Sequence, residues 1–256
     1  MSAPRIFTPE YYARMRALEG RGWWKAGMRE VAAMLIDLAE LPPEGILLDV
    51  GCGSGQTMSW FLAARRGWTP IGVDLAPEGL DAARNAGLRR LLRTSALNLP
   101  LADQSVDLVI TLNMLQHLPL GGGDRIALAE MHRVLRPGGY LFVRTNALAF
   151  PRTPDDADVN FRRCEPDTLR REMVEAGYRV VRLSRINAVL GLAEIPRELR
   201  AHHRDGARYH GILARSGNAA AAAERVKRAW LRCDARAVQR GWSLPLGRSI
   251  VALARA

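Results

Sequence analysis

Three glycines alternate with other residues directly after a short apolar segment, in the stretch LLDVGCGSGQT at residues 47–57. Glycine lets the backbone turn sharply and lets a ligand approach it without a Cβ in the way. The preceding residues 46–50 have the apolar composition of a buried strand, and the residues after the loop indicate a helix. A loop between the first strand and first helix of a parallel sheet lies at its carboxyl edge, where such sheets bind ligands. We therefore expect a ligand at this loop.

Short apolar strands recur along the chain and alternate with segments of helical periodicity. Such alternation is typical of an α/β fold, in which helices cover both faces of a parallel sheet. The sequence Arg136-Pro-Gly-Gly139 is a turn signal that should end the helix at 127–135 and begin the next strand. The predicted strands are 46–50, 69–73, 106–111, 140–145, 178–184 and 249–254.

The 256 residues are enough for one well-buried domain. Residues 9–41 indicate two helices, and residues 219–239 indicate a further helix within a segment that interrupts the strand pattern. An insertion of this size near a sheet edge more often forms a lid than a separate domain. We predict a single domain with a helical cap at 1–43, a ligand-binding core at 44–184, a helical lid at 185–247 and a last strand at 248–256.

The spacing of the glycines excludes two common ligand classes. A dinucleotide-binding loop has the pattern G-x-G-x-x-G, which would need glycine at position 56 or 58, where Gln56 and Met58 stand. A phosphate-binding loop of the P-loop type would need a lysine directly after it, and none follows. The observed pattern is G-x-G-x-G preceded by the acid Asp49.

This pattern resembles that of the class I S-adenosylmethionine (SAM)-dependent methyltransferases, in particular the bacterial group that acts on small molecules and quinone-like compounds. The motifs are LLDVGCGSG, the acid in IGVD, the block LNLPLADQSVDLVITLNMLQHL and the segment EMHRVLRPGGYLFVRT. The resemblance covers roughly residues 10–256 and is strongest over 46–146. It implies a Rossmann-like methyltransferase fold, with a seven-stranded, mostly parallel sheet whose last strand is antiparallel, and methyl transfer from SAM.

SAM carries a ribose but no phosphate, so its site needs hydroxyl recognition and close backbone approach rather than an anion cradle. Asp74 ends the second strand 19 residues after Gly55, close to the spacing expected of an acid that binds ribose hydroxyls. The alternative role for Asp74 is the N-cap of a helix that begins near Pro77. By the resemblance, Asp49 organises the loop and the amino-acid end of SAM. The expected cofactor-binding set is Asp49, Gly51, Cys52, Gly53, Gly55, Asp74, Leu75, Ser95, Ala96, Leu97 and Asn113.

The family pattern leads to separate predictions for Ser95 and Asn113. Relatives often have an acid at Ser95 that accepts a hydrogen bond from adenine, so adenine recognition here should rely on the backbone of Ala96 and Leu97. Asn113 follows the fourth strand and should face the methionine portion of SAM. Asp107, which starts that strand, is expected to be structural.

The acceptor site is less well defined by the sequence. His117 lies after the fourth strand and is the candidate catalytic base, although a polar residue that stabilises a short helix would fit equally. Trp23 and Trp24 belong to an E-x-x-x-W-W-x-x-G stretch like that of the bacterial group, and they either line the pocket or anchor the N-terminal helices. Tyr11 and Tyr209 are further candidate substrate-binding residues. No metal site is predicted.

The net charge of +11 raises the question of nucleic-acid binding. Residues 1–161 contain 17 basic and 17 acidic side chains, so the excess lies in 162–256, with 20 basic against 9 acidic. A GC-rich genome encodes proteins rich in arginine and alanine, and this would explain the excess as well as an RNA-binding face does. No apolar run approaches the roughly 18 residues of a membrane span, no secretory signal is evident, and Cys52, Cys164 and Cys233 are widely separated. These features predict a cytoplasmic protein with reduced thiols and no membrane partner.

Three functions are therefore open. The first is methylation of an O, N or C nucleophile of a small-molecule acceptor, with no nucleic-acid partner. The second is an RNA or protein methyltransferase that uses the arginine-rich region 162–256. The third is a SAM-binding protein without catalysis. The sequence TLNM after the fourth strand is not the N-P-P-aromatic motif of amino-methylating enzymes, and no Pro-Cys pair for cytosine C5 chemistry is present. The acceptor and the oligomeric state are not determined by the sequence.

Overall fold

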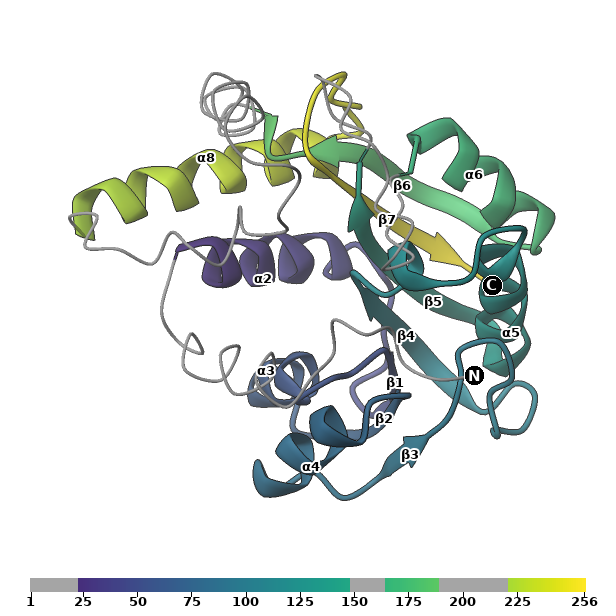
Figure 1. The fold of residues 1–256 in the computed structure, drawn as a ribbon. Coiled ribbons are helices and arrows are strands. Elements are labelled where there is room, and N and C mark those ends of the chain that lie inside the picture. Colours follow the sequence, from purple (N-terminus) through teal and green to yellow (C-terminus); the bar gives the residue numbers. More distant parts are fainter. Residues whose placement is uncertain (1–22, 148–163, 189–220) are drawn as a thin grey trace, which may run out of the picture.

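The structure is a computed structural model that describes residues 23–147, 164–188 and 221–256. In these residues, seven strands form one sheet in the order β3-β2-β1-β4-β5-β7-β6 (Figure 1). Strands β1 to β5 pair in parallel, whereas β7 lies antiparallel between β5 and β6. The predicted seven-stranded sheet with an antiparallel last strand is confirmed. The strands are β1 (Gly45–Val50), β2 (Trp68–Asp74), β3 (Leu91–Arg93), β4 (Val106–Leu112), β5 (Leu135–Asn146), β6 (Arg179–Ile186) and β7 (Ser249–Arg255).

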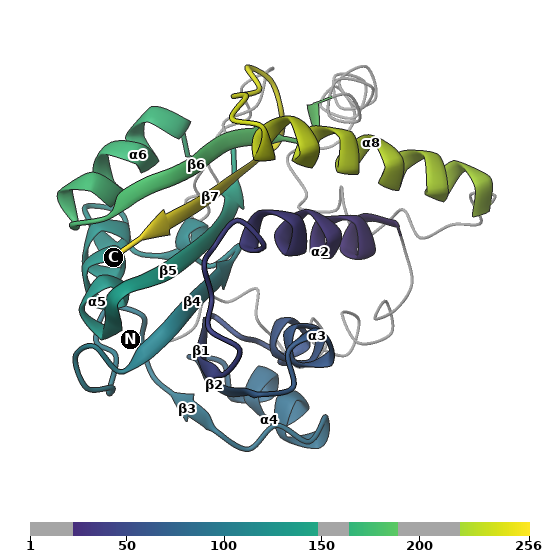
Figure 2. The ribbon, with the colours of Figure 1, turned by 180° about the vertical axis from the view of Figure 1, so that it is seen from behind.

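Helices cover both faces of the sheet (Figures 1 and 2). One face is covered by α5 and α6, and the other by α2, α3, α4 and α8. A short 3-10 helix, η1, follows β4. The bounds are α2 (Trp23–Ile36), α3 (Gln56–Ala64), α4 (Pro77–Asn85), η1 (Leu115–His117), α5 (Gly123–Val134), α6 (Pro166–Glu175) and α8 (Ala221–Gln239).

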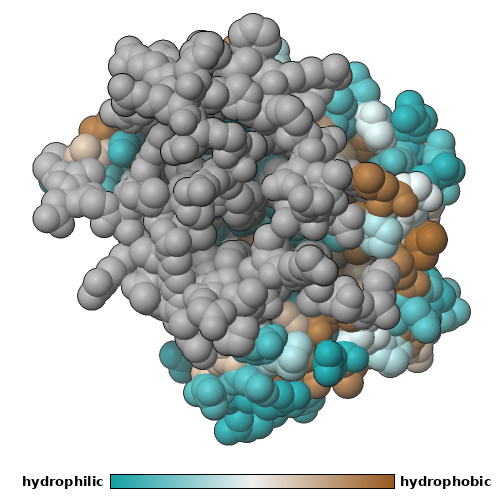
Figure 3. Space-filling view, viewed as in Figure 1, coloured by the Kyte–Doolittle hydropathy of each residue, from teal (hydrophilic) through white to brown (hydrophobic). Residues whose placement is uncertain are grey.

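Alternation along each strand divides the core into two layers. In β5, Leu141 and Val143 pack toward α5 and α6, while Tyr140 and Phe142 pack toward α2 and α8. This two-sided burial explains why the strands are continuous apolar runs rather than half-polar ones. The outer side of α4 is hydrophilic, as Figure 3 shows, because residues such as Asp81 and Arg84 face solvent.

Helices α2 and α8 lie side by side, although they are far apart in the sequence (Figure 2). Leu231 of α8 is fully buried and packs close to Gly27 of α2, where a Cβ would lie 2.5 Å from Leu231 Cδ1. Glu30 forms an ion pair with Arg228 across the same contact. Asp234 of α8 accepts hydrogen bonds from the backbone N–H groups of Asn187 and Ala188, which joins α8 to the end of β6.

Two local features differ from the prediction. Strand β3 was not predicted, because two of its three residues are exposed and show no apolar run. The predicted turn Arg136-Pro-Gly-Gly139 belongs to β5 as an irregular section. Leu135 before it already pairs with Val106, and Gly138 and Gly139 exchange backbone hydrogen bonds with Ala256, so the four residues bulge without ending the strand.

The first of the two predicted N-terminal helices lies outside the described residues, and the second corresponds to α2. None of the helices in the described part of the chain combines the length and the hydropathy of a membrane span.

The contact between α2 and α8 gives a stability prediction. We expect Leu231→Ala to lower the free energy of unfolding by about 2–5 kcal/mol, since it leaves a cavity against Gly27. Trp230→Ala is the matched control on the exposed side of α8, with an expected change within about 0.5 kcal/mol. Urea unfolding of both variants measures the difference. Equal effects of the two substitutions would contradict the buried packing of Leu231.

Candidate functional site

The glycine loop after β1 has a backbone conformation that requires glycine. Gly51, Gly53 and Gly55 all have positive φ angles of 78°, 49° and 76°. A Cβ at Gly51 would lie 2.7 Å from Met114, and one at Gly55 would overlap Leu88. The loop is therefore packed tightly between the segment after β4 and the segment after α4.

Asp74 at the end of β2 holds this loop in place. One oxygen of its carboxylate accepts a hydrogen bond of 2.8 Å from the N–H of Gly53, and the other accepts one of 2.8 Å from the N–H of Ala76. Burial raises the pKa of Asp74, and these backbone hydrogen bonds oppose that rise. The bond to Ala76 resembles the predicted capping role, but Ala76 itself is the N-cap residue of α4. Each carboxylate oxygen retains acceptor capacity for a second donor.

Asp49 is a second carboxyl group in the same site and is almost completely buried, with 1% of its surface exposed. Its Oδ2 atom has no hydrogen-bond partner among the described residues. Burial, and then the nearby charge of Asp74, raise the pKa of Asp49 from 3.8 to about 8. Such a group gains from a cationic or donor ligand placed beside it.

Cys52 lies inside the loop with its thiol buried. Burial, followed by the charges of Asp49 and Asp74, raises the pKa of this thiol well above its usual range. Cys52 is therefore a packing residue of the loop and not a nucleophile. Its neighbour across the loop is Gly72, where a Cβ would lie 2.9 Å from the Cys52 Sγ atom.

The expected adenine-binding turn is formed by Ser95, Ala96 and Leu97. The hydroxyl oxygen of Ser95 accepts a hydrogen bond of 3.1 Å from the N–H of Leu97, and the carbonyl of Ser95 accepts one from Asn98. Ala96 is buried, with 8% exposed. The serine side chain thus stabilises the turn, which follows β3 next to Asp74. Leu75, also in the expected set, accepts a hydrogen bond from Arg93 through its carbonyl.

Asn113 and Met114 directly follow β4. Asn113 has a positive φ of 58°, an uncommon conformation for a residue other than glycine. Its N–H donates to the carbonyl of Arg144 at 2.7 Å, and its side-chain oxygen accepts from Arg144 Nε at 3.3 Å. Met114 is the residue next to Gly51, so the end of β4 and the glycine loop meet.

His117 ends the 3-10 helix η1 and is partly buried. Its Nε2 atom lies 3.3 Å from the side-chain nitrogen of Gln116. This places the candidate base at the same carboxyl edge as Asn113, four residues further along the chain. Whether His117 moves a proton stays a prediction.

Trp23 and Trp24 lie in the first turn of α2 and pack partly against the core. Their rings contact each other edge to face at 5.6 Å, and the Lys227 ammonium lies 5.1 Å from the centre of the Trp23 ring. The contact with Lys227 links α2 to α8 and favours the anchoring role, without excluding contact with a ligand. Tyr11 and Tyr209 lie outside the described residues.

Asp107 has the structural role that was expected. Its carboxylate accepts a hydrogen bond from the N–H of Ile46 at 2.7 Å and forms an ion pair with Arg136. These contacts tie the starts of β1, β4 and β5 together at the edge opposite the glycine loop.

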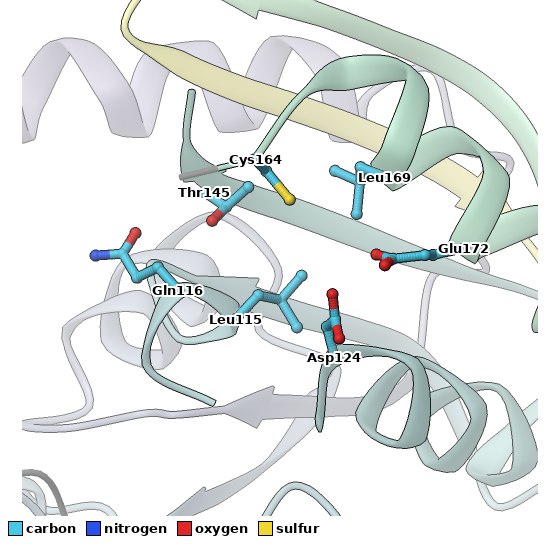
Figure 4. Close-up of a pocket in the computed structure, with 7 residues that line it drawn as sticks. All are labelled: Leu115, Gln116, Asp124, Thr145, Cys164, Leu169 and Glu172. Atoms are coloured by element: carbon cyan, nitrogen blue, oxygen red, sulfur yellow. The ribbon is translucent and has the colours of Figure 1, made fainter. Parts of the chain in front are cut away.

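A narrow crevice with no room for a water molecule lies on the α5 and α6 face of the sheet (Figure 4). Figure 4 shows the carboxylates of Asp124 and Glu172 directed into it, while the Gln116 amide points away. In the part of the chain that the structure describes, no three metal-ligating side chains cluster there or elsewhere. The remaining lining residues are Leu115, Thr145, Cys164 and Leu169.

A larger, open hollow of about 510 Å³ lies beside α3 and α4. It includes Ser54 of the glycine loop and Gln56, where α3 begins, but none of Asp49, Asp74 and Asn113. The side chains of the glycine-loop site that can accept hydrogen bonds from a ligand therefore do not line this hollow.

Residues 48–143 match a family model described as a methyltransferase domain. These residues, somewhat over a third of the chain, are therefore similar to that domain family. An uncharacterized methyltransferase of Mycobacterium ulcerans is 44% identical over 100 residues, which are 36% of this chain and 36% of the relative. A human protein named "Probable tRNA methyltransferase 9B" is 31% identical over 106 residues, 41% of this chain and 22% of the relative.

A solved structure with the same fold is phosphoethanolamine N-methyltransferase 2 of Haemonchus contortus in complex with SAM. It has a TM-score of 0.63 at 15% identity and covers 98% of this chain and 58% of that one. The chain thus spans well under half the length of these two sequence relatives, and the likeness to the solved structure concerns the fold.

The residues of the methyltransferase domain fit its cofactor, SAM. SAM carries a sulfonium and an ammonium group, and its ribose hydroxyls are hydrogen-bond donors. The unpartnered Oδ2 of Asp49 and the remaining acceptor capacity of Asp74 suit these groups. Met114 and Leu88, against which the loop glycines pack, were not identified from the sequence, because close backbone approach leaves no residue-type signature.

The raised pKa of Asp49 gives a prediction for pH. A carboxyl group that holds its proton more tightly in the folded chain makes the free energy of unfolding fall as the pH rises from about 4 to 8. We expect Asp49→Asn to reduce this fall but not to abolish it, because the pKa values of Asp74 and Asp234 are also raised by burial. Urea unfolding at pH 5 and pH 8 measures it.

The control is Asp81→Asn, which removes a carboxylate from an exposed ion pair on α4. It should leave the wild-type difference between pH 5 and pH 8 in place. An unchanged difference in Asp49→Asn would show that Asp49 ionises normally in the folded protein.

Proposed function

We propose that this protein is a SAM-dependent methyltransferase that transfers a methyl group to a small-molecule acceptor. The observation that carries the proposal is a pair of carboxyl groups around a glycine loop with three positive φ angles: Asp49, which is buried, and Asp74, which is partly buried. The carboxyl oxygens of this arrangement can face a cation and can accept hydrogen bonds from hydroxyl groups, but they would repel a phosphate. Membership of the bacterial small-molecule and quinone-type group is part of the same proposal, and its support is the set of sequence motifs.

SAM, when bound, supplies a methyl group that is already activated by the sulfonium charge. The task left to the chain is to hold the acceptor in line and to exclude water, which can contribute about 7–11 kcal/mol through positioning. Asp74 would orient the ribose while it keeps the loop closed through Gly53. Asn113 and Met114 would lie at the methionine end, since Met114 packs beside Gly51.

His117 would take the proton of an acceptor that arrives protonated. Its place at the carboxyl edge after β4 supports this role. A cytoplasmic location is part of the same proposal.

The decisive measurement is calorimetric titration with SAM and with its demethylated product. We expect the wild type to bind both and Asp74→Ala to bind SAM at least tenfold more weakly, because the loop and the ribose lose a charged acceptor. Asp81→Ala is the control, since it removes an exposed carboxylate of α4. A folded wild type that binds neither ligand would refute the proposal, and so would full affinity in Asp74→Ala.

A second candidate is methylation of RNA or protein, with the arginine-rich region 162–256 holding a polyanion. The observation that favours it is the segment shared with the human protein named as a tRNA methyltransferase. The excess of 20 basic over 9 acidic side chains in that region is consistent with it.

This candidate predicts a steep salt dependence. If the region holds RNA, the affinity for transfer RNA should fall about a thousandfold or more between 50 and 200 mM salt, as multiple phosphate contacts are lost. Filter binding or fluorescence anisotropy with total transfer RNA measures it. Weak binding with little dependence on salt would favour the small-molecule acceptor.

A further inference from the structure

Arg144 is a charged residue in an otherwise apolar stretch of β5. Tyr140 and Phe142 precede it on the same side of the strand and belong to the core beneath α2 and α8. Its neighbours on the adjacent strands are Leu112 of β4 and Val251 of β7. The guanidinium thus projects from the sheet among apolar side chains, near the carboxyl edge.

Among the residues that the structure describes, the guanidinium of Arg144 has one neutral hydrogen-bond partner and no anionic one. Nε donates to the side-chain oxygen of Asn113 at 3.3 Å. Within residues 23–147, 164–188 and 221–256, no carboxylate lies within ion-pair distance of it. By contrast, Arg133 and Arg136 each pair with carboxylates. Burial lowers the pKa of Arg144 to about 10.

An unpaired guanidinium in such surroundings costs stability, because it loses hydration without gaining a counter-charge. At about pH 7 the group is still charged. It offers five N–H donors in a planar fork that matches a carboxylate in two parallel hydrogen bonds. Arg144 is not fully buried, so a ligand can reach part of it.

The position of Arg144 relative to the cofactor site is fixed by the strand registers. Asp49 pairs with Ile110, which pairs with Phe142, so Arg144 lies on the same face as Asp49 and one step nearer the carboxyl edge. Asp74 on β2 is three strands away from β5, about 14 Å across the sheet. Asn113 contacts Arg144 directly and neighbours Met114, which contacts the glycine loop. The guanidinium therefore lies beyond the methionine end of the cofactor site, away from its ribose end.

We propose that Arg144 binds a carboxylate group of the methyl acceptor and thereby selects acidic small molecules. This inference rests on the proposed function. Asn113 holds Nε of Arg144, so that the two terminal nitrogens of the guanidinium remain to meet the two carboxylate oxygens. A carboxylate carries one negative charge and a phosphate dianion carries two. We favour the carboxylate because, on β4, β5 and β7, Arg144 is the one cationic side chain at this position.

The test uses the full chain saturated with the demethylated cofactor. The probes are acetate, hexanoate, benzoate and indole-3-acetate, each paired with its neutral amide, and phenyl phosphate as a second anion. Ligand-observed NMR and thermal melting measure binding. We expect at least one carboxylate to bind tenfold more tightly than its amide and more tightly than phenyl phosphate.

Variants then assign this preference to one side chain. Arg144→Met should abolish it, and Arg144→Lys should retain part of it, because the charge stays while the planar fork is lost. Arg90→Met removes an exposed arginine and is the control. Calorimetry with SAM should give the same affinity for both Arg144 variants as for the wild type. If Arg144→Met unfolds, the test rests on Arg144→Lys, in which the ratio of carboxylate affinity to amide affinity should be smaller than in the wild type.

The outcomes separate the two proposals. A wild type that does not bind SAM overturns both. Binding of SAM with no preference for any carboxylate over its amide overturns the role of Arg144 alone, and so does a preference that persists in Arg144→Met. A tenfold loss of SAM affinity in the folded Arg144 variants would assign the guanidinium to the cofactor instead.

Discussion

The carboxylate of Asp74 joins two loops at the carboxyl edge of the sheet, and the candidate site depends on this junction. By accepting one backbone N–H from the glycine loop and one from the start of α4, it fixes the ends of β1 and β2 relative to each other. The cost is a partly buried negative charge beside a second carboxyl group, Asp49, whose pKa is raised first by its own burial and then by the charge of Asp74. The two carboxyl groups are therefore in an unfavourable electrostatic environment, which a cationic ligand would improve. The geometry of the site thus favours a cationic ligand.

The same edge changes its electrostatic character from one side to the other. Toward β2 it presents the carboxyl groups of Asp49 and Asp74, and toward β5 it presents the guanidinium of Arg144. Asn113 stands between the two regions and contacts the arginine through both its backbone and its side chain. A cationic cofactor and an anionic acceptor would thus each find a position of opposite charge, which would orient both.

Sequence reasoning predicted the parts of the fold whose physical cause is local. The six strands that it located are apolar runs because both faces of the sheet are covered. It missed β3, which is only three residues long, is joined to the sheet by backbone pairing with β2 and leaves two of its residues exposed. It also placed a turn at Arg136, where tertiary contacts with Asp107 and Ala256 keep the chain in the strand.

The site was predicted unevenly for a similar reason. The glycines and Asp74 follow spacing rules that a single sequence displays, and the structure brings them together. Arg144 could not be singled out, since an arginine within YLFVRT becomes unusual only when it is known that no described carboxylate pairs with it.

The place of β7 in the sheet has a consequence for how the chain assembles. Strand β6 has β7 as its single neighbour in the sheet, although it precedes β7 by more than sixty residues. During synthesis β6 has no edge to join until Ser249–Arg255 has left the ribosome, and α8, which packs on α2, emerges only shortly before. Strands β1 to β5 can pair earlier, so the acidic half of the site can form on the nascent chain while the half that carries Arg144 waits for its last neighbour.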